Sequence, residues 1–244
     1  MSKLLSSVGI GNAEVDTILP TDTVVPGQSI DATVEIEGGS AEQAIEEIYF
    51  ALVTKYQTEE GYATGTIQKY KLVDDFTIEA GEKRTEAVTI DVPYKTPLTM
   101  GRTGVWVETG LDIDWAIDPQ DRDQLEVDPD ARLEALIDAI GSLGFRFHSA
   151  DVMASTQGGF MTRSFVQELE FRPREGPFAG RLEDIEVIPV PDSSDVEVVV
   201  EVDKRTGLLD EIASWDDSRS SLSFDHADAD RLRGDLEAAI ENHL

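Results

Sequence analysis

The chain has 244 residues, and its 50 Asp and Glu against 20 Lys and Arg give a formal charge of −30. The absence of cysteine excludes disulfides, thiolate catalysis and cysteine-ligated zinc or iron–sulfur sites. No basic stripe, no run of 18 apolar residues and no signal-peptide core occur, which argues against nucleic-acid binding, stable membrane insertion and secretion. We therefore expect a cytoplasmic protein.

The acidic residues are spread through the apolar periodicity, and 40% of the residues are hydrophobic, so we expect the chain to fold. A surface with this charge repels itself in dilute buffer. At molar salt the Debye length is about 3 Å and most of the repulsion is screened. Arginine also outnumbers lysine, with 13 of the 20 basic residues. These features indicate a salt-rich cytoplasm, as in a halophile.

Residues 1–118 have the pattern of a β-sandwich. Apolar and polar side chains alternate from Ile30 to Ile36 and again from Ile48 to Tyr56, and turn signals such as Pro26-Gly27 separate the runs. Further strands are expected at 14–19, 66–73, 76–78, 88–92, 104–108 and 111–116. Many short strands with almost no helical period predict an N-terminal sandwich.

Residues 119–130 read as an exposed acidic linker between two domains. The stretch from Asp112 to Asp130 holds eight acidic residues and one basic residue, with two prolines that restrict the residues before them. We interpret this stretch as the joint around which the two halves of the chain are arranged.

Residues 131–224 are expected to form a second sandwich that begins with a helix. Asp128 looks like the N-cap, with Pro129 in the first turn and an apolar stripe that ends near Gly141 and Gly144. Strands follow at 145–147, 152–153, 165–173, 182–190 and 196–202. Residues 207–224 stay unassigned.

Residues 225–244 have the spacing of an amphipathic helix, with Asp225 as the expected cap. Its apolar face holds Leu232, Leu236 and Ile240. This face needs a cover, which is either the helix's own domain or a second copy of the chain in a homodimer.

Several segments resemble the SpoOM-type sporulation-control family. They are Gln167–Pro173, Gly176–Glu183 and Glu201–Arg205 in the second half, and Ala13–Leu19, Pro26-Gly27, Gly38-Gly39 and Leu111–Asp123 in the first half. The resemblance implies a mainly β, arrestin-like tandem of two β-sandwich domains, with a short helix after the inter-domain joint and a C-terminal helix. It implies a regulatory or scaffolding role without catalysis. The high acidic charge leads us to expect a haloarchaeal member of this family.

The scarce cations of the second half suggest contacts across the joint. We expect polar contacts that bring some of Arg172, Arg181, Lys204 and Arg205 to the acidic residues Asp112, Asp114, Asp121 and Asp123. Exposed sheet edges are natural pairing surfaces, so protein partners of unknown identity are expected there and at the acidic joint. The first hypothesis is thus a non-catalytic adaptor, with no cofactor and no catalytic residue.

Two alternatives remain open. A cation- or small-ligand-binding protein would use the acidic loop 112–130, but an EF-hand that begins at Asp112 would need an oxygen ligand and a glycine where Ala116 and Ile117 stand. We therefore expect no specific metal. A hydrolase would use His148, Ser149 and Asp151, although neighbouring side chains of a strand point to opposite faces.

Overall fold

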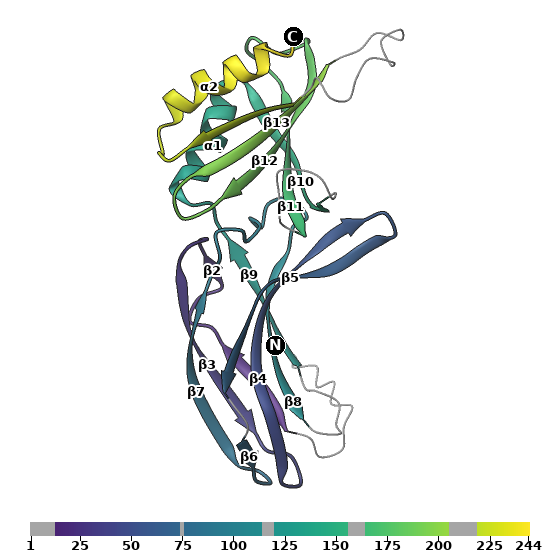
Figure 1. Cartoon of the computed structure of the whole chain (residues 1–244), viewed down its shortest axis with the longest axis vertical. Coiled ribbons are helices and arrows are strands. Elements are labelled where there is room, and N and C mark those ends of the chain that lie inside the picture. Colours follow the sequence, from purple (N-terminus) through teal and green to yellow (C-terminus); the bar gives the residue numbers. More distant parts are fainter. Residues whose placement is uncertain (1–12, 74–75, 114–119, 156–163, 205–218) are drawn as a thin grey trace.

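The computed structural model describes residues 13–73, 76–113, 120–155, 164–204 and 219–244 (Figure 1). The N-terminal half contains the strands β1 (Glu14–Ile18), β2 (Thr23–Val24), β3 (Ser29–Glu37), β4 (Gln43–Thr58), β5 (Gly61–Val73), β6 (Phe76–Ile78), β7 (Lys83–Asp91), β8 (Val105–Ile113) and β9 (Gln120–Val127). The C-terminal half contains α1 (Ala131–Ser142), β10 (Phe145–Ala154), β11 (Phe165–Pro173), β12 (Leu182–Pro191), β13 (Val196–Lys204), β14 (Arg219–Phe224) and α2 (Ala229–Glu241).

The N-terminal half is a sandwich of two antiparallel layers. One layer is the three-stranded sheet β1-β3-β7, and the other contains β4, β5, β6, β8 and β9. In β3 every second side chain is buried, as the alternation predicts, and these side chains share one core with the buried residues of β4 and β8. The core residues of these strands include Val34, Ile36, Ile48, Leu52 and Val107.

The C-terminal half is one antiparallel sheet, in the order β14-β13-β12-β11-β10, with two helices on one face (Figure 1). In β13 the four alternating valines Val196, Val198, Val200 and Val202 are buried. The helices α1 and α2 pack on each other and cover this face. The mainly β fold with two helices is as predicted, and in this half the second layer is the pair of helices in place of a second sheet.

The two halves share a continuous sheet. The strand order runs from β14 through β10 to β4, β8, β9 and β2. The connection is a parallel bridge in which Met153 of β10 pairs with Gln57 near the end of β4. Since β4 has 16 residues, it is long enough to reach from the N-terminal sandwich to the joint.

The acidic stretch 119–130 differs from the expected exposed connector. Residues 120–127 form β9, which pairs with β8 along six residue pairs and with β2 along two. Leu125 and Val127 are buried on the face that also holds Asp121 and Asp123. Backbone pairing and two apolar anchors therefore outweigh the loop-like composition, and only the residues after Val127 connect to α1.

Both helices begin later than predicted. The side chain of Asp130, not Asp128, accepts the backbone N–H groups of Arg132 and Leu133 and forms the N-cap of α1. In α2 the N-cap is Asp228, whose side chain accepts the N–H of Arg231, in place of Asp225. In each case an aspartate closer to the apolar stripe satisfies the free amides of the first turn.

The apolar face of α2 is covered within the same chain. Leu232, Leu236 and Ile240 are fully buried against α1 and the sheet. Of the two possibilities left open by the sequence, the structure thus shows that the helix packs on its own domain. Of the helices that the structure describes, none is both long and apolar enough to cross a lipid bilayer.

Candidate functional site at the joint between the two halves

Gln167 of β11 joins the C-terminal sheet to the loop between β7 and β8. Its side-chain oxygen accepts the N–H of Leu98 at 2.8 Å, and its side-chain nitrogen donates to the carbonyl of Leu98 at 2.7 Å and to Oγ1 of Thr103 at 3.1 Å. Gln167 is 7% exposed and Leu98 is 1% exposed. These hydrogen bonds fix the loop against β11. If the loop moved away, the buried polar groups of Gln167 and Leu98 would lose their hydrogen bonds without gaining water in exchange.

A few residues further along the same loop, Arg102 forms an ion pair with Asp151 of β10. One guanidinium nitrogen lies 3.0 Å from each carboxylate oxygen. Asp151 raises the pKa of Arg102 through this hydrogen bond and its charge. The Arg102 side chain is 74% exposed, so solvent screens the pair.

Gly101 allows the loop to come this close to β10. Its φ is 61°, in the left-handed region that favours glycine. A Cβ at this position would lie 2.9 Å from the backbone nitrogen of Ala150. Both the backbone conformation and the close contact therefore require glycine here.

Aromatic contacts cover the side of the joint formed by β4 and β11. The rings of Tyr56 and Phe165 stack with centroids 5.5 Å apart and planes at 24°. Gly65 of β5 lies under Phe165, since a Cβ there would be 2.6 Å from the ring. This contact lies beside the bridge between β4 and β10.

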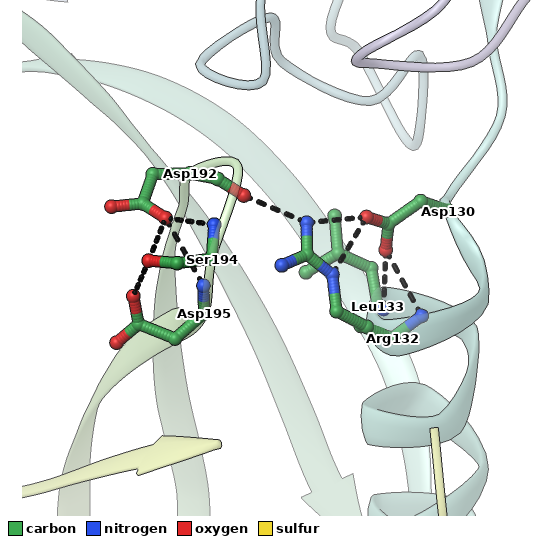
Figure 2. A network of polar contacts seen from close by, with 6 residues as sticks. All are labelled: Asp130, Arg132, Leu133, Asp192, Ser194 and Asp195. Carbon is green, nitrogen blue, oxygen red and sulfur yellow. Dashed lines mark hydrogen bonds and ion pairs between the residues drawn. The ribbon is translucent and has the colours of Figure 1, made fainter. Parts of the chain in front are cut away.

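A polar network links the start of α1 to the turn between β12 and β13 (Figure 2). The guanidinium of Arg132 donates to Asp130 through Nε at 3.1 Å and Nη2 at 2.9 Å, and Nη2 also donates to the carbonyl of Asp192 at 2.8 Å. The side chains of Asp130 and Arg132 are each 15% exposed. The N-cap of α1 thus also holds the cation that fixes the neighbouring turn.

The network continues on both sides of Arg132. The guanidinium lies 5.4 Å from the ring centroid of Tyr94, which belongs to the N-terminal half. On the other side, the carboxylate of Asp192 accepts the backbone N–H groups of Ser194 and Asp195, and these bonds lower the pKa of Asp192 to about 2. Arg132 is therefore in contact with α1, the β12–β13 turn and the N-terminal half.

A cavity of about 20 Å³ lies within the joint, lined by residues 94–98, Leu133, 165–167, Pro189 and Pro191. This is the space of one water molecule, far below the several hundred Å³ of a small-molecule site. Oγ1 of Thr96 is buried and has no hydrogen-bond partner among the described residues. The joint is thus a packed and mostly satisfied interface, with no room for a substrate in the part that the structure describes.

The cations expected at the joint stay within the C-terminal half where the structure describes them. Arg172 pairs with Glu170 at 2.8 Å and lies 3.9 Å from Asp184. The exposed Arg181 follows the turn at Phe178, to whose carbonyl its backbone N–H donates. The structure does not bring Arg172 to Asp121 or Asp123.

Asp121 and Asp123 belong to β9, and their side chains face β1 of the N-terminal half. Oδ2 of Asp121 accepts the N–H of Thr17 at 2.8 Å, while Oδ2 of Asp123 is buried without a partner among the described residues. Burial first, and then the charges of Asp121 and Asp16 with a hydrogen bond to Asp121, raise the pKa of Asp123 to about 7. The two carboxyls thus interact with each other and not with a cation across the joint.

The other four expected contact residues lie outside the description. Asp114 and Arg205 are in segments that the structure does not describe, and the same holds for the side chains of Asp112 and Lys204. For these residues the contact across the joint stays a prediction.

The residues of the hydrolase alternative have separate contacts. Asp151 pairs with Arg102, the hydroxyl of Ser149 donates to Glu170 at 2.8 Å, and His148 lies 3.9 Å from the same carboxylate. In the described ranges no three His, Asp or Glu side chains group as metal ligands. Within these ranges we find neither a Ser–His–Asp arrangement nor a metal centre.

The sequence pattern missed the residues that hold the joint. Gln167 does carry a signal, because it is the one polar residue on the buried face of β11 with Leu169 and Phe171. A glutamine at such a position predicts a satisfied buried amide. The pairing of Arg102 with Asp151 has no comparable signal, since the partners are 49 positions apart.

Comparisons with known proteins agree with this fold. The model of the SpoOM protein family matches residues 1–206. The sporulation-control protein spo0M of Bacillus subtilis (strain 168) is 34% identical over 252 aligned positions, which span 99% of this chain and 96% of that protein. The crystal structure of Spo0M from Bacillus subtilis superposes with a TM-score of 0.86 at 32% identity, over 96% of this chain and 100% of that one. The chain therefore belongs to the SpoOM family of sporulation-control proteins.

Proposed function

We propose that this protein is a non-catalytic regulatory adaptor of the sporulation-control type, which binds protein partners through an exposed sheet edge beside its joint. Family membership supports a regulatory role. The packed joint, with space for about one water molecule, supports binding on the outside of the molecule over chemistry inside it.

The observation that carries the proposal is the edge of β5. Within the described residues this 13-residue strand pairs with β4 alone, so its other edge has no neighbouring strand. In Figure 1 the tip of the β4–β5 hairpin projects to the side of the molecule at the level of the joint. Tyr62 near this tip is 66% exposed. Such an edge can add a strand from a partner.

The joint gives this edge a fixed position relative to the C-terminal sheet. Phe165 of β11 stacks on Tyr56 of β4 and lies over Gly65 of β5, while Gln167 binds the loop at Leu98. A partner at β5 would thus meet one preorganised surface made by both halves, which lowers the ordering cost of binding.

Photo-crosslinking in cells at native salt tests the proposal. A benzophenone amino acid replaces the exposed Thr66 of β5, and the matched control carries it at the exposed Ala238 of α2. We expect a recurrent partner to be cross-linked from Thr66 at least fivefold more than from Ala238. Equal recovery from both positions, or recovery of the chain alone, would refute the adaptor role at this edge.

Cation binding by the acidic stretch 112–130, which includes β9, is the second proposal for this chain. It gains support from Asp121 and Asp123, whose carboxyls are in contact. A bound cation would reduce the electrostatic repulsion between these two groups. Calorimetry with calcium in molar KCl tests this proposal. Saturable heat would favour this stretch as a binding site, and weak heat without saturation would remove it.

A further inference from the structure

The open face of the C-terminal sheet is the face that α1 and α2 leave uncovered. It carries acidic side chains on three adjacent strands, namely Glu168 and Glu170 of β11, Glu186 of β12, and Glu201 and Asp203 of β13. The opposite face is apolar and covered by the helices. The open face is thus a half-buried acidic surface in the middle of a sheet.

Three glutamates on this face stand directly opposite one another. The strand register pairs Glu170 with Glu186 and Glu186 with Glu201. Directly opposite side chains in antiparallel strands have Cβ atoms about 5 Å apart, and like charges at that separation destabilise the pairing. The row therefore places three carboxyl groups on directly opposite positions of adjacent strands.

Among the residues that the structure describes, arginines neutralise the two ends of the row. Arg172 binds Glu170 at 2.8 Å, and Arg219 of β14 binds Glu201 at 2.7 Å. The carboxylate of Glu186 has no ion pair or hydrogen bond among the described residues. Burial and the surrounding carboxylates, Glu168 and Glu201 foremost, raise the pKa of Glu186 to about 7. The centre of the row thus lacks one positive charge.

An open groove with a volume of about 330 Å³ lies on β12, β13 and β14. It is lined by Val190, residues 197–199 and residues 221–223. Val199 is directly opposite Ser221 and only two positions from Glu201, which places it about 7 Å along β13 from the row. A hollow that has Val190 and Val199 among its lining residues, beside Glu197 and two serines, therefore adjoins the acidic row at the spacing of residues i and i+2 of an extended chain.

We propose that the open face docks an extended, cationic segment of a partner protein, with a Lys or Arg side chain on Glu186 and an apolar side chain two residues away in the groove at Val199. The inference rests on the adaptor function and adds the chemistry of the partner. Charge complementarity selects this occupant, since a cation at Glu186 completes a row whose ends are already paired. The groove makes the second contact, which depends on apolar area and not on charge.

Binding of a synthetic peptide to the full chain tests the proposal. The probe is a labelled peptide, Lys-Ser-Leu-Ser-Lys-Ser-Leu, followed by fluorescence anisotropy in 0.15 M KCl. A second peptide with serine in place of leucine removes the apolar contact. Glu186→Gln removes the central charge, and the matched control Asp235→Asn removes one charge from the exposed surface of α2. Circular dichroism checks that both variants fold.

We expect saturable binding to the wild-type chain, at least tenfold weaker binding to Glu186→Gln, and a change below twofold in Asp235→Asn. The peptide without leucine should also bind at least tenfold more weakly. Equal losses in the two variants would show attraction to the overall charge alone and would overturn the proposal, as would binding that does not saturate. A partner cross-linked from Thr66 would leave the adaptor function standing in that case, so the two failures are distinguishable.

Discussion

Gln167 binds both backbone groups of Leu98, although the two residues are 69 positions apart and belong to different halves of the chain. The amide of Gln167 acts on Leu98 as a neighbouring strand would, with one accepted and one donated hydrogen bond. Because both residues are buried, water cannot replace either bond without opening the joint.

Replacement of Gln167 by Leu should destabilise the joint. The N–H and carbonyl of Leu98 would stay buried without partners, at a cost of about 1–3 kcal/mol for each group. We expect the free energy of unfolding, measured by urea denaturation in molar KCl, to fall by about 2–4 kcal/mol. The control Gln124→Leu changes an exposed residue of β9 and should have an effect below about 0.5 kcal/mol. A Gln167→Leu variant as stable as this control would show that the amide does not hold the loop.

The ion pair between Arg102 and Asp151 should control the local opening of the joint. We expect amide hydrogen exchange in residues 99–104 to accelerate in Arg102→Gln and in Asp151→Asn, and the double variant should show no further increase. The pair is exposed, so salt should accelerate exchange in the wild type and not in the variants. The control Lys83→Gln breaks the ion pair with Glu37 in the N-terminal sandwich. If it accelerated exchange at 99–104 equally, the effect would not belong to the joint.

Strand alternation made much of the fold predictable. In β3 the apolar positions of the sequence are the buried positions of the structure, and in β13 the four alternating valines are buried while Val199 lies on the open face. The stretch of β9 reads as a linker because Asp121 and Asp123 occupy the same face as Leu125 and Val127. Its strand conformation depends on pairing with β8 and β2, which a local pattern does not contain.

The contacts of the joint were less predictable than the strands. Ion-pair partners far apart in the chain meet only because β10 and β11 extend the sheet of the N-terminal half. The excess of acidic residues did suggest that some of the scarce cations would pair with carboxylates. It did not identify which one, and Arg172 pairs with Glu170, two residues away on its own strand.

Asp130 should stabilise the start of α1 in two separable ways. Asp130→Ala removes both the N-cap and the partner of Arg132, and we expect a loss of about 2 kcal/mol in the free energy of unfolding. Asp130→Asn keeps an oxygen that caps the helix and removes only the charge, so its loss should be about 1 kcal/mol smaller. Urea denaturation followed by helical circular dichroism measures both. Equal losses in the two variants would mean that the cap contributes nothing beyond the charge.

Asp123 should make the protein less stable as the pH rises towards 7. Its pKa is about 7 in the folded chain and near 3.8 in the unfolded one, so between these values the folded state holds a proton that the unfolded state has lost. The free energy of unfolding therefore falls as the pH rises from about 4 to 7. Asp123→Asn removes this titration.

We expect the stability gain of Asp123→Asn to be smallest at pH 5 and to reach about 1–2 kcal/mol at pH 8, a size that allows for solvent screening of this partly exposed group. Thermal unfolding of both chains at pH 5, 6, 7 and 8 in molar KCl measures it. The control Glu126→Gln removes a charge from an exposed position of the same strand and should give no comparable gain. A variant less stable than the wild type at pH 8 would show that the ionised carboxyl stabilises β9, because a favourable partner would then have to face Oδ2.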